Sequence, residues 1–218
     1  MPPMIETHQA STCPDLEFGC AFEPGDALTF PKVAEIVSVF TRPGCDGGRL
    51  GDGIRSACLR YALHRKLLRD PSVLLHIAGW MGWIDANVVR VESVESVHLH
   101  HEFGYVSQVD LVAELNGIGW TVIDVETQQF NRSRDGTAFF CPTWPLRLSA
   151  AQQAILSSSA RNVSALVSVV IDCDRPGRIH VRRWNCGQDE PDHFRTFLAA
   201  FAVWKYLNHY NPGPRVYL

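Results

Sequence analysis

Three carboxylates, Asp110, Asp124 and Glu126, stand in two short runs that are rich in β-branched residues. The pair Asn116-Gly117 lies between the runs and tolerates positive φ, so it favours a hairpin turn. Carboxylate oxygens are the ligands that Mg²⁺ or Mn²⁺ prefers, and neither cysteine nor histidine stands beside these acids. The residue types therefore point to a divalent-metal site on a strand hairpin.

The register of this hairpin decides whether the acids meet. A three-residue loop pairs Leu115 with Gly119, and Asp110 then lies opposite Asp124, with Glu126 on their face. A two-residue loop slips the pairing by one and buries Asp110 among apolar side chains without a partner, so we expect the three-residue loop. The opposite face is apolar and should pack on the core; its residues are Val109, Leu111, Ala113, Leu115, Ile123 and Val125.

Directly opposed carboxylates on neighbouring strands repel, because their Cβ atoms lie roughly 5 Å apart. A cation or a shared proton between them removes this repulsion, which makes the pair a candidate Mg²⁺ or Mn²⁺ site. The alternative is a hairpin with one packed face and one solvated polar face. The pattern alone fits both interpretations.

The hairpin resembles the PD-(D/E)XK nuclease superfamily, in particular its RecB-like branch and the mitochondrial genome maintenance exonuclease type. Asp110 and Asp124 match the two acids of the family motif, and Thr127 matches the threonine that often ends it. Glu126 stands where the family has lysine. The resemblance covers about residues 51–208. It implies an α/β fold with a restriction-endonuclease-like αβββαβ core, in which helices flank a mixed central sheet.

The resemblance also implies roles for further residues. In the family the two acids hold the metal, and the lysine activates water and stabilises charge on the phosphate. Glu95, or Glu92, falls on the strand that often adds a glutamate ligand, and His64 falls on the helix that often adds a histidine. Gln153 matches the glutamine that orients nucleic acid or the site. The implied catalytic set is Asp110, Asp124, Glu126 and Gln153, and the implied metal ligands are Asp110, Asp124, Glu95 and His64.

The sequence departs from the family pattern at three positions. Glu126 reverses the charge where the scissile phosphate should lie. Ser107 replaces a common glycine, and Ser157 stands where the glutamine motif has tyrosine. Some members of the superfamily work with an acid at the lysine position, so the motif allows an active or a decayed site.

The length of 218 residues, 46% of them hydrophobic, provides one sizeable α/β core and is short for two domains. We expect an extended arm over 1–31 and a single nuclease-like domain over 32–218. The net charge of −3 excludes a global basic field, so contact with nucleic acid must be local. No apolar run approaches the ~20 residues that span a bilayer, and we expect no membrane partner.

The cysteines indicate an intracellular protein, because the seven thiols form no C-x-x-C pair and leave an odd count. The first thirty residues contain neither lysine nor arginine and do not form a presequence or a secretory signal as written. The expected address is cytoplasmic or, from the family resemblance, mitochondrial.

Hydrophobic periodicity predicts the elements that position the hairpin. We expect a short helix or strand over 33–40 and a glycine-rich loop over 42–53. Asp52 and Ser149 are the expected N-caps of two helices. The expected helices and strands are, in order, helices 52–69 and 73–83, strand 88–98, helix 149–160, and strands 163–171 and 178–184. A final helix begins near Glu190 and turns inward Phe194, Phe197, Leu198, Phe201, Trp204 and Leu207.

Two sets of arginines are candidates for phosphate contact. The helix 52–69 carries the densest basic patch, which a solvated face or an acidic protein partner explains equally well. Its members are Arg55, Arg60, Arg65, Lys66 and Arg69. Arg132 and Arg134 follow the hairpin in an irregular connection near the expected site. We take Arg55, Arg65, Arg132 and Arg134 as the nucleic-acid-binding candidates.

Histidines gather at the end of the strand 88–98, where the sequence reads His98, His100, His101 and Glu102. Alternation puts His98 and His100 on one face, a geometry that can bind a transition metal. Two further ligands are not evident, so a solvated strand end is the favoured interpretation.

Three functions fit these residues. The first is a degenerate, catalytically weak or inactive nuclease-like protein that serves as a nucleic-acid-binding or scaffolding subunit of a larger assembly, such as a mitochondrial ribonucleoprotein. The second is an active Mg²⁺-dependent DNA exonuclease, in which Glu126 is a base or a metal ligand and Arg132 or Arg134 supplies the missing positive charge. The third is a plain α/β interaction domain. A basic group beside Asp124 favours the enzyme, and an open carboxylate cluster lined by a protein partner favours the scaffold.

Overall fold

The computed structural model describes residues 30–40, 48–66, 71–129, 138–184 and 192–210. The arm expected over 1–31 lies outside these residues up to position 29. Arg69, Arg132 and Arg134 also lie outside them. Within the described ranges, no helix is long and apolar enough to cross a membrane.

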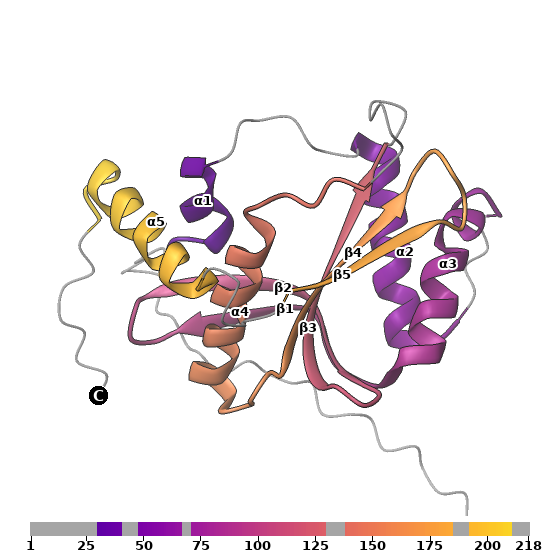
Figure 1. The fold of residues 1–218 in the computed structure, drawn as a ribbon, viewed down its shortest axis with the longest axis horizontal. Coiled ribbons are helices and arrows are strands. Elements are labelled where there is room, and N and C mark those ends of the chain that lie inside the picture. Colours follow the sequence, from indigo (N-terminus) through magenta and orange to yellow (C-terminus); the bar gives the residue numbers. More distant parts are fainter. Residues whose placement is uncertain (1–29, 41–47, 67–70, 130–137, 185–191, 211–218) are drawn as a thin grey trace, which may run out of the picture.

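Helices flank a five-stranded sheet whose order along the sheet follows the order along the chain, β1-β2-β3-β4-β5 (Figure 1). β3 and β4 run parallel, whereas the other neighbours are antiparallel. The elements are α1 (Val33–Val37), the 3₁₀ turn η1 (Ser38–Phe40), α2 (Gly48–His64), α3 (Pro71–Asn87), β1 (Val88–His100), β2 (Tyr105–Leu115), β3 (Gly119–Gln128), α4 (Trp144–Ser159), β4 (Ala165–Asp172), β5 (Ile179–Trp184) and α5 (His193–Leu207). This mixed α/β sheet confirms the predicted fold class and is consistent with a restriction-endonuclease-like core.

The β2–β3 hairpin has the predicted three-residue register. Leu115 pairs with Gly119, and Ile118 N donates to Leu115 O at 3.1 Å. Gly119 has a φ of +97°, a conformation that side-chain-bearing residues rarely adopt, which favours glycine at the closing position. The paired ladder ends at Leu111 and Ile123. Each of these residues directly adjoins an acid, so the acids stand where the two strands separate.

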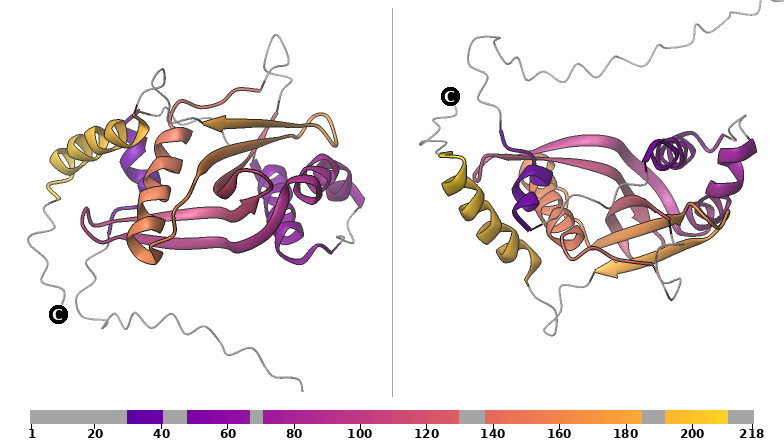
Figure 2. Two further views of the ribbon diagram at one scale, coloured as in Figure 1. Left: turned by 60° about the horizontal axis from the view of Figure 1, so that its bottom comes forward. Right: turned by 90° about the horizontal axis from the view of Figure 1, so that it is seen from above.

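Both faces of the sheet are covered by helices, so the alternative of a hairpin with one solvated face is wrong. α2 and α3 pack on the face that holds Leu111 and Ile123, whereas α4 packs on the opposite face against Val112 and Val122. Figure 2 shows these helices on the two sides of the strands. Val122 lies two residues before Asp124 and shares its face, so burial of Val122 under α4 brings this helix over the side of β3 that carries Asp124 and Glu126. Val109 was expected on the same face as Leu111 and Ile123, but it packs against α4 on the opposite face.

Two helix starts differ from their predicted positions. α2 begins at Gly48, so Asp52 lies within the helix and does not cap it. α4 begins at Trp144 and has Pro145 in its first turn, where the absent N–H of proline removes no hydrogen bond. Ser149 therefore lies inside the helix, and its hydroxyl donates to Leu146 O at 2.9 Å.

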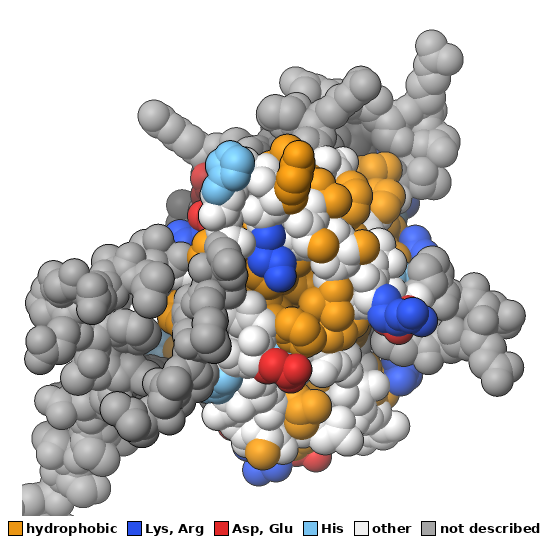
Figure 3. Space-filling model, turned by 90° about the vertical axis from the view of Figure 1, so that its left-hand side faces the viewer, with side chains coloured by type: hydrophobic (Ala, Val, Ile, Leu, Met, Phe, Trp, Pro, Cys, Tyr) orange, Lys and Arg blue, Asp and Glu red, His pale blue; other side chains and the backbone are white. Residues whose placement is uncertain are grey.

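α5 packs on α1 and α4 through one face and exposes a second apolar face. Asp192 caps the helix by accepting a hydrogen bond from Arg195 N at 3.0 Å, close to the expected start. Phe197 and Phe201 are buried as predicted, but Leu207 is 61% exposed. Hydrophobic side chains are visible on this side of the molecule in Figure 3.

Candidate functional site

A pocket of about 300 Å³ lies where β2 and β3 separate. Strand residues form its floor, and α1, α2 and α4 contribute side chains to its walls. Three acids and three cations line it, namely Asp110, Asp124, Glu126, Lys32, Arg55 and Arg147. The predicted acids are therefore together, but with basic partners that compensate their charge.

α2 brings Arg55 to the pocket because the helix approaches β3 very closely. A Cβ at Gly51 would lie 2.4 Å from Thr127 Oγ1, so only glycine fits there without a shift. On the other side of α2, Trp80 Nε1 donates to Cys58 O at 2.8 Å and ties the helix to α3. These contacts fix the turn of α2 that carries Arg55.

Arg55 donates two hydrogen bonds to Asp110. Arg55 Nε donates to Asp110 Oδ2 at 3.2 Å, and Arg55 Nη2 donates to Oδ1. Val125 N also donates to Asp110 Oδ2, at 2.9 Å. Burial, followed by repulsion from Asp124, raises the pKa of Asp110, and Arg55 opposes both effects. The carboxylate of Asp110 thus takes the place of a main-chain acceptor where the ladder has ended.

α4 carries the second arginine and is held firmly over the sheet. Tyr105 OH donates to Ala150 O at 2.9 Å in a buried hydrogen bond. Gln152 Nε2 donates to Val163 O at 2.8 Å, near the other end of the helix. Arg147 therefore projects into the pocket from a helix whose position is set by independent contacts.

Arg147 joins the two remaining acids. Its Nη2 donates to Asp124 Oδ2 at 2.7 Å and also to Glu126 Oε1. Burial, followed by the negative charge of Asp124, raises the pKa of Glu126 to about 7 although Arg147 lowers it. Burial disfavours the charge of Arg147, but Asp124 and Glu126 outweigh it and raise the pKa of the guanidinium. Arg147 Nε is buried and has no hydrogen-bond partner among the described residues.

The elevated pKa of Glu126 predicts that the protein loses stability as the pH rises from 5 to 8. The folded-state pKa of about 7 lies above the ordinary 4.5, so the stabilisation is complete below about 4.5 and is lost as the pH passes through 7. One pKa unit corresponds to about 1.4 kcal/mol, and partial exposure of Glu126 reduces the effect, so we expect a loss of about 2 kcal/mol. Urea unfolding at both pH values measures it.

Glu126→Gln is the control for this pH dependence. The variant should lose less stability than the native protein between pH 5 and pH 8, because glutamine has no proton to release. Identical losses in the two proteins would contradict the assignment to Glu126. Asp110, whose pKa is also raised by burial and by repulsion from Asp124, contributes in the same direction.

The carboxylates in this arrangement do not fit a divalent metal ion. Both oxygens of Asp110 accept hydrogen bonds from Arg55, and Asp124 and Glu126 share Nη2 of Arg147. Within the described ranges, no three His, Cys, Asp or Glu side chains are grouped so that they could hold one metal ion. An ion bound by Asp110 would compete with Arg55 for both carboxylate oxygens.

The other implied site residues do not line the pocket. Glu95 lies near its rim, with Oε1 3.9 Å from Arg55 Nη1, and is largely exposed. Glu92 pairs with Arg161 at 2.8 Å. His64 is exposed at the last residue of α2, nine residues beyond Arg55 or about 13 Å along the helix. Gln153 is half-buried on α4, which contributes Arg147, Leu148 and Ala151 to the pocket instead.

Two arginines of the basic patch expected on α2 form ion pairs within the chain. Arg55 is committed to Asp110, and Arg65 Nη1 donates to Asp85 Oδ1 at 2.9 Å. Arg60 is exposed elsewhere on the helix. The nucleic-acid-binding candidates Arg55 and Arg65 therefore contact carboxylates within the same chain.

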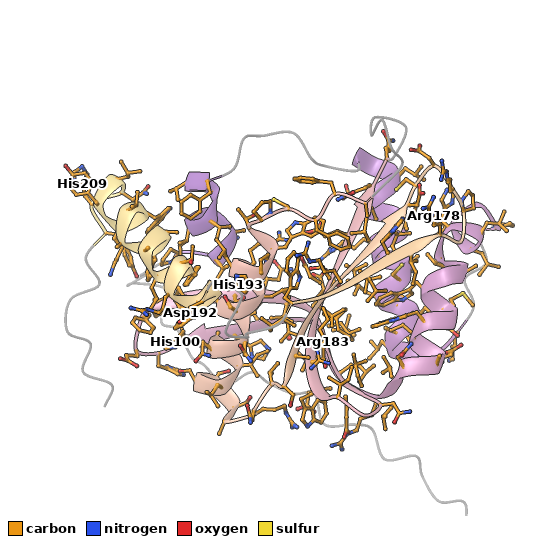
Figure 4. All side chains as sticks on the ribbon, in the orientation of Figure 1. His100, Arg178, Arg183, Asp192, His193 and His209 are labelled. Carbon is orange, nitrogen blue, oxygen red and sulfur yellow. The ribbon has the colours of Figure 1, made fainter. Side chains whose placement is uncertain are left out.

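His98 and His100 of the histidine cluster make contacts within the fold. His100 is buried, with ring centroids 4.8 Å from Phe103 and 6.4 Å from Phe194, so it is not part of a solvated strand end. Figure 4 places His100 near the beginning of α5. His98 lies between Ser96 Oγ at 2.9 Å and Ser158 Oγ at 3.2 Å.

Sequence reasoning missed Arg147 and Lys32. A signal for Arg147 was present, because it interrupts an apolar and small-residue run from Trp144 to Ala151. A charge at a position that faces a core requires a partner of opposite charge, and Asp124 and Glu126 were available. Lys32 directly precedes the short helix α1, and the sequence around it contains no comparable sign of a buried charge.

No protein-family model and no curated protein matches the chain. Among solved structures, an alkaline exonuclease from Laribacter hongkongensis is similar to it at 14% sequence identity, covering 82% of this chain and 91% of the other, with a TM-score of 0.37. A likeness this distant does not carry an activity from one chain to the other. The site must therefore be interpreted from its own contacts.

Proposed function

We propose that this chain is a degenerate nuclease-like protein, catalytically weak or inactive, which binds nucleic acid as a subunit of a larger assembly. The resemblance to the mitochondrial genome maintenance exonuclease type suggests a mitochondrial ribonucleoprotein as that assembly. The observation that carries the proposal is the double arginine clamp on the three acids: Arg55 on Asp110, and Arg147 on Asp124 and Glu126.

The clamp argues against metal-dependent cleavage for an electrostatic reason. The three carboxylates face Arg55, Arg147 and Lys32, so opposite charges balance within the pocket. A divalent ion would add charge to a site that is already compensated and would leave at least one guanidinium without its partner. Such a displacement is unfavourable where both groups are largely withdrawn from water.

An active Mg²⁺-dependent DNA exonuclease is the second candidate, and the position of Arg147 favours it. Arg147 Nη2 lies 2.7 Å from Asp124 Oδ2, and so brings positive charge to the place where the family has its lysine. A guanidinium there can bind a phosphate oxygen. It acts in this way only if Asp124 and Glu126 release it.

Cleavage of end-labelled single-stranded DNA and RNA in Mg²⁺ and in Mn²⁺ tests the proposal. We expect native protein to cleave no faster than Asp124→Ala, while both proteins bind the same strands in a separate anisotropy assay. Cleavage by native protein that disappears in Asp124→Ala would establish the enzyme. Absence of binding to either strand would refute the nucleic-acid-binding role.

A double variant tests whether the Glu126–Arg147 pair is what keeps this pocket from cleaving nucleic acid. Glu126→Lys alone would place an ammonium against the guanidinium of Arg147, so it needs Arg147→Gln in the same chain. The single variant Arg147→Gln is the matched control. Metal-dependent cleavage gained in the double variant alone would assign the inactivity to the Glu126–Arg147 pair.

A further inference from the structure

The edge strand β5 and the turn before it carry cations without carboxylate partners. In the described part of the chain, no ion pair involves Arg175, Arg178, Arg182 or Arg183. By contrast, five other arginines are paired with acids: Arg55, Arg65, Arg90, Arg147 and Arg161. Figure 4 labels Arg178 near the turn and Arg183 further along the strand. Four arginines without an ion pair among the described residues therefore lie on this edge strand and in the turn before it, although the overall charge is −3.

Arg182 is the most closely constrained of the four. Its guanidinium carbon lies 4.1 Å from the ring centroid of Trp184 and 5.7 Å from that of Phe140. Trp184 is buried, and its Nε1 donates to the buried Ser168 Oγ at 2.9 Å, which fixes the indole ring. Arg182 itself is exposed. A guanidinium held on an aromatic ring loses little conformational freedom when it binds a phosphate.

The sheet register places Arg182 on the same face as the pocket. Asp124 on β3 is the partner of Ser168 on β4, and Ser168 is the partner of Arg182 on β5. Neighbouring strands are about 4.8 Å apart, so Arg182 lies roughly 10 Å across the sheet from Asp124. Arg178 directly precedes β5 and is four residues from Arg182, or about 13 Å along the chain. Arg182 thus lies on the pocket face of the edge strand, Arg178 lies just before the strand, and Arg183 lies on the opposite face by alternation.

We propose that these β5 arginines, with Arg182 at the centre, bind the sugar–phosphate backbone of a single-stranded nucleic acid. The inference rests on the proposed function and identifies the surface that carries it. A row of separated cations along an extended strand suits a polymer whose phosphates repeat regularly, and planar guanidinium groups bind phosphate oxygens in pairs. Binding of this kind is independent of base sequence.

The structure offers a matched control for Arg182. Arg161 also stacks on a tryptophan, with its guanidinium carbon 4.1 Å from the ring centroid of Trp120. Unlike Arg182, it is paired with an acid, because its Nη2 donates to Glu92 Oε1 at 2.8 Å. Arg182→Gln and Arg161→Gln therefore remove the same charge and the same kind of stacking, but only the first removes an unpaired cation.

Fluorescence anisotropy with labelled mixed-sequence DNA and RNA strands, titrated with full-length protein at several salt concentrations, tests the surface. We expect Arg182→Gln to weaken binding about three- to tenfold at low salt. Its slope of log K against log[salt] should become shallower by about 0.7 for each phosphate that the variant no longer neutralises. Arg161→Gln should match native protein. Arg182→Lys should keep the native slope but bind more weakly, because it retains the charge and loses the planar group.

The possible outcomes separate this surface from the proposed function. Native binding with unchanged affinity and slope in Arg178→Gln/Arg182→Gln/Arg183→Gln would overturn the β5 surface and leave the proposed function standing. Failure of native protein to bind any strand would overturn both. Competition by poly-glutamate as strong as that by nucleic acid of equal charge would replace the nucleic acid with an acidic protein partner. Circular dichroism and thermal melting verify that each variant is folded.

Discussion

Asp110→Ala should lower the free energy of unfolding by about 3 kcal/mol. The substitution removes the acceptor of the buried Val125 N–H, and an unsatisfied buried donor costs about 1–3 kcal/mol. It also leaves Arg55 without the carboxylate that binds it twice. Asp110 is only 7% exposed, so water does not readily replace these hydrogen bonds. Urea unfolding at pH 7, analysed by linear extrapolation, gives the difference.

Two variants test whether the stability lost in Asp110→Ala comes from the buried hydrogen bonds of Asp110, or whether removing an exposed ion pair near α2 has the same effect. Asp110→Asn keeps an acceptor for Val125 N and should lose less stability, about 1 kcal/mol. Asp85→Ala removes the partner of Arg65, which directly follows α2, and of Tyr61 OH on that helix. Asp85 is 53% exposed, so water can replace these contacts and the loss should stay below about 1 kcal/mol. Equal effects of Asp110→Ala and Asp85→Ala would contradict the structural role of Asp110.

Arg147→Met should lower the free energy of unfolding by about 2–3 kcal/mol at pH 8. Methionine preserves the packing of the side-chain stem but leaves Asp124 and Glu126 facing each other without a cation. The loss should be smaller at pH 5, because Glu126, whose pKa is already about 7, then carries a proton. Unfolding in urea at the two pH values measures both effects.

A double-mutant cycle isolates the interaction between Arg147 and the acids. Adding Glu126→Gln to Arg147→Met should recover more than half of the stability lost at pH 8, because it removes the repulsion that the first change creates. Additive losses would mean that the arginine contributes through packing alone. That result would also weaken the argument that the clamp excludes a metal ion.

The central hairpin was predictable because its determinants are local. Turn chemistry at Asn116-Gly117 and alternation along the two runs left two registers. The cost of burying Asp110 without a partner favoured the Leu115–Gly119 register, which the structure confirms. The same local reasoning brought Asp110, Asp124 and Glu126 to one place, and periodicity predicted the strands and most helices. Boundary errors arose where a residue has two common positions, as for Ser149, which can cap a helix or lie within it.

The charge partners of the acids could not be derived from the same patterns. Arg55 belongs to a helix whose exposed face is basic, and nothing local distinguishes it from Arg60. Its pairing depends on how closely Gly51 lets the helix approach β3. Arg147 became a pocket residue only because α4 covers the acidic face of the sheet. A tertiary arrangement therefore joins each of the three acids to an arginine.

The Arg55–Asp110 hydrogen bonds and the Arg147 hydrogen bonds to Asp124 and Glu126 close chain loops of different length. The difference predicts the order in which these contacts form during folding. The Arg147 bonds join residues 21 and 23 positions apart, within the β3–α4 unit, whereas the Arg55–Asp110 bonds join residues 55 positions apart. The larger loop costs about 0.8 kcal/mol more to close. Arg147 should therefore find its acids early, and substitutions there should slow folding. Removal of the Arg55 side chain should instead appear mainly as faster unfolding.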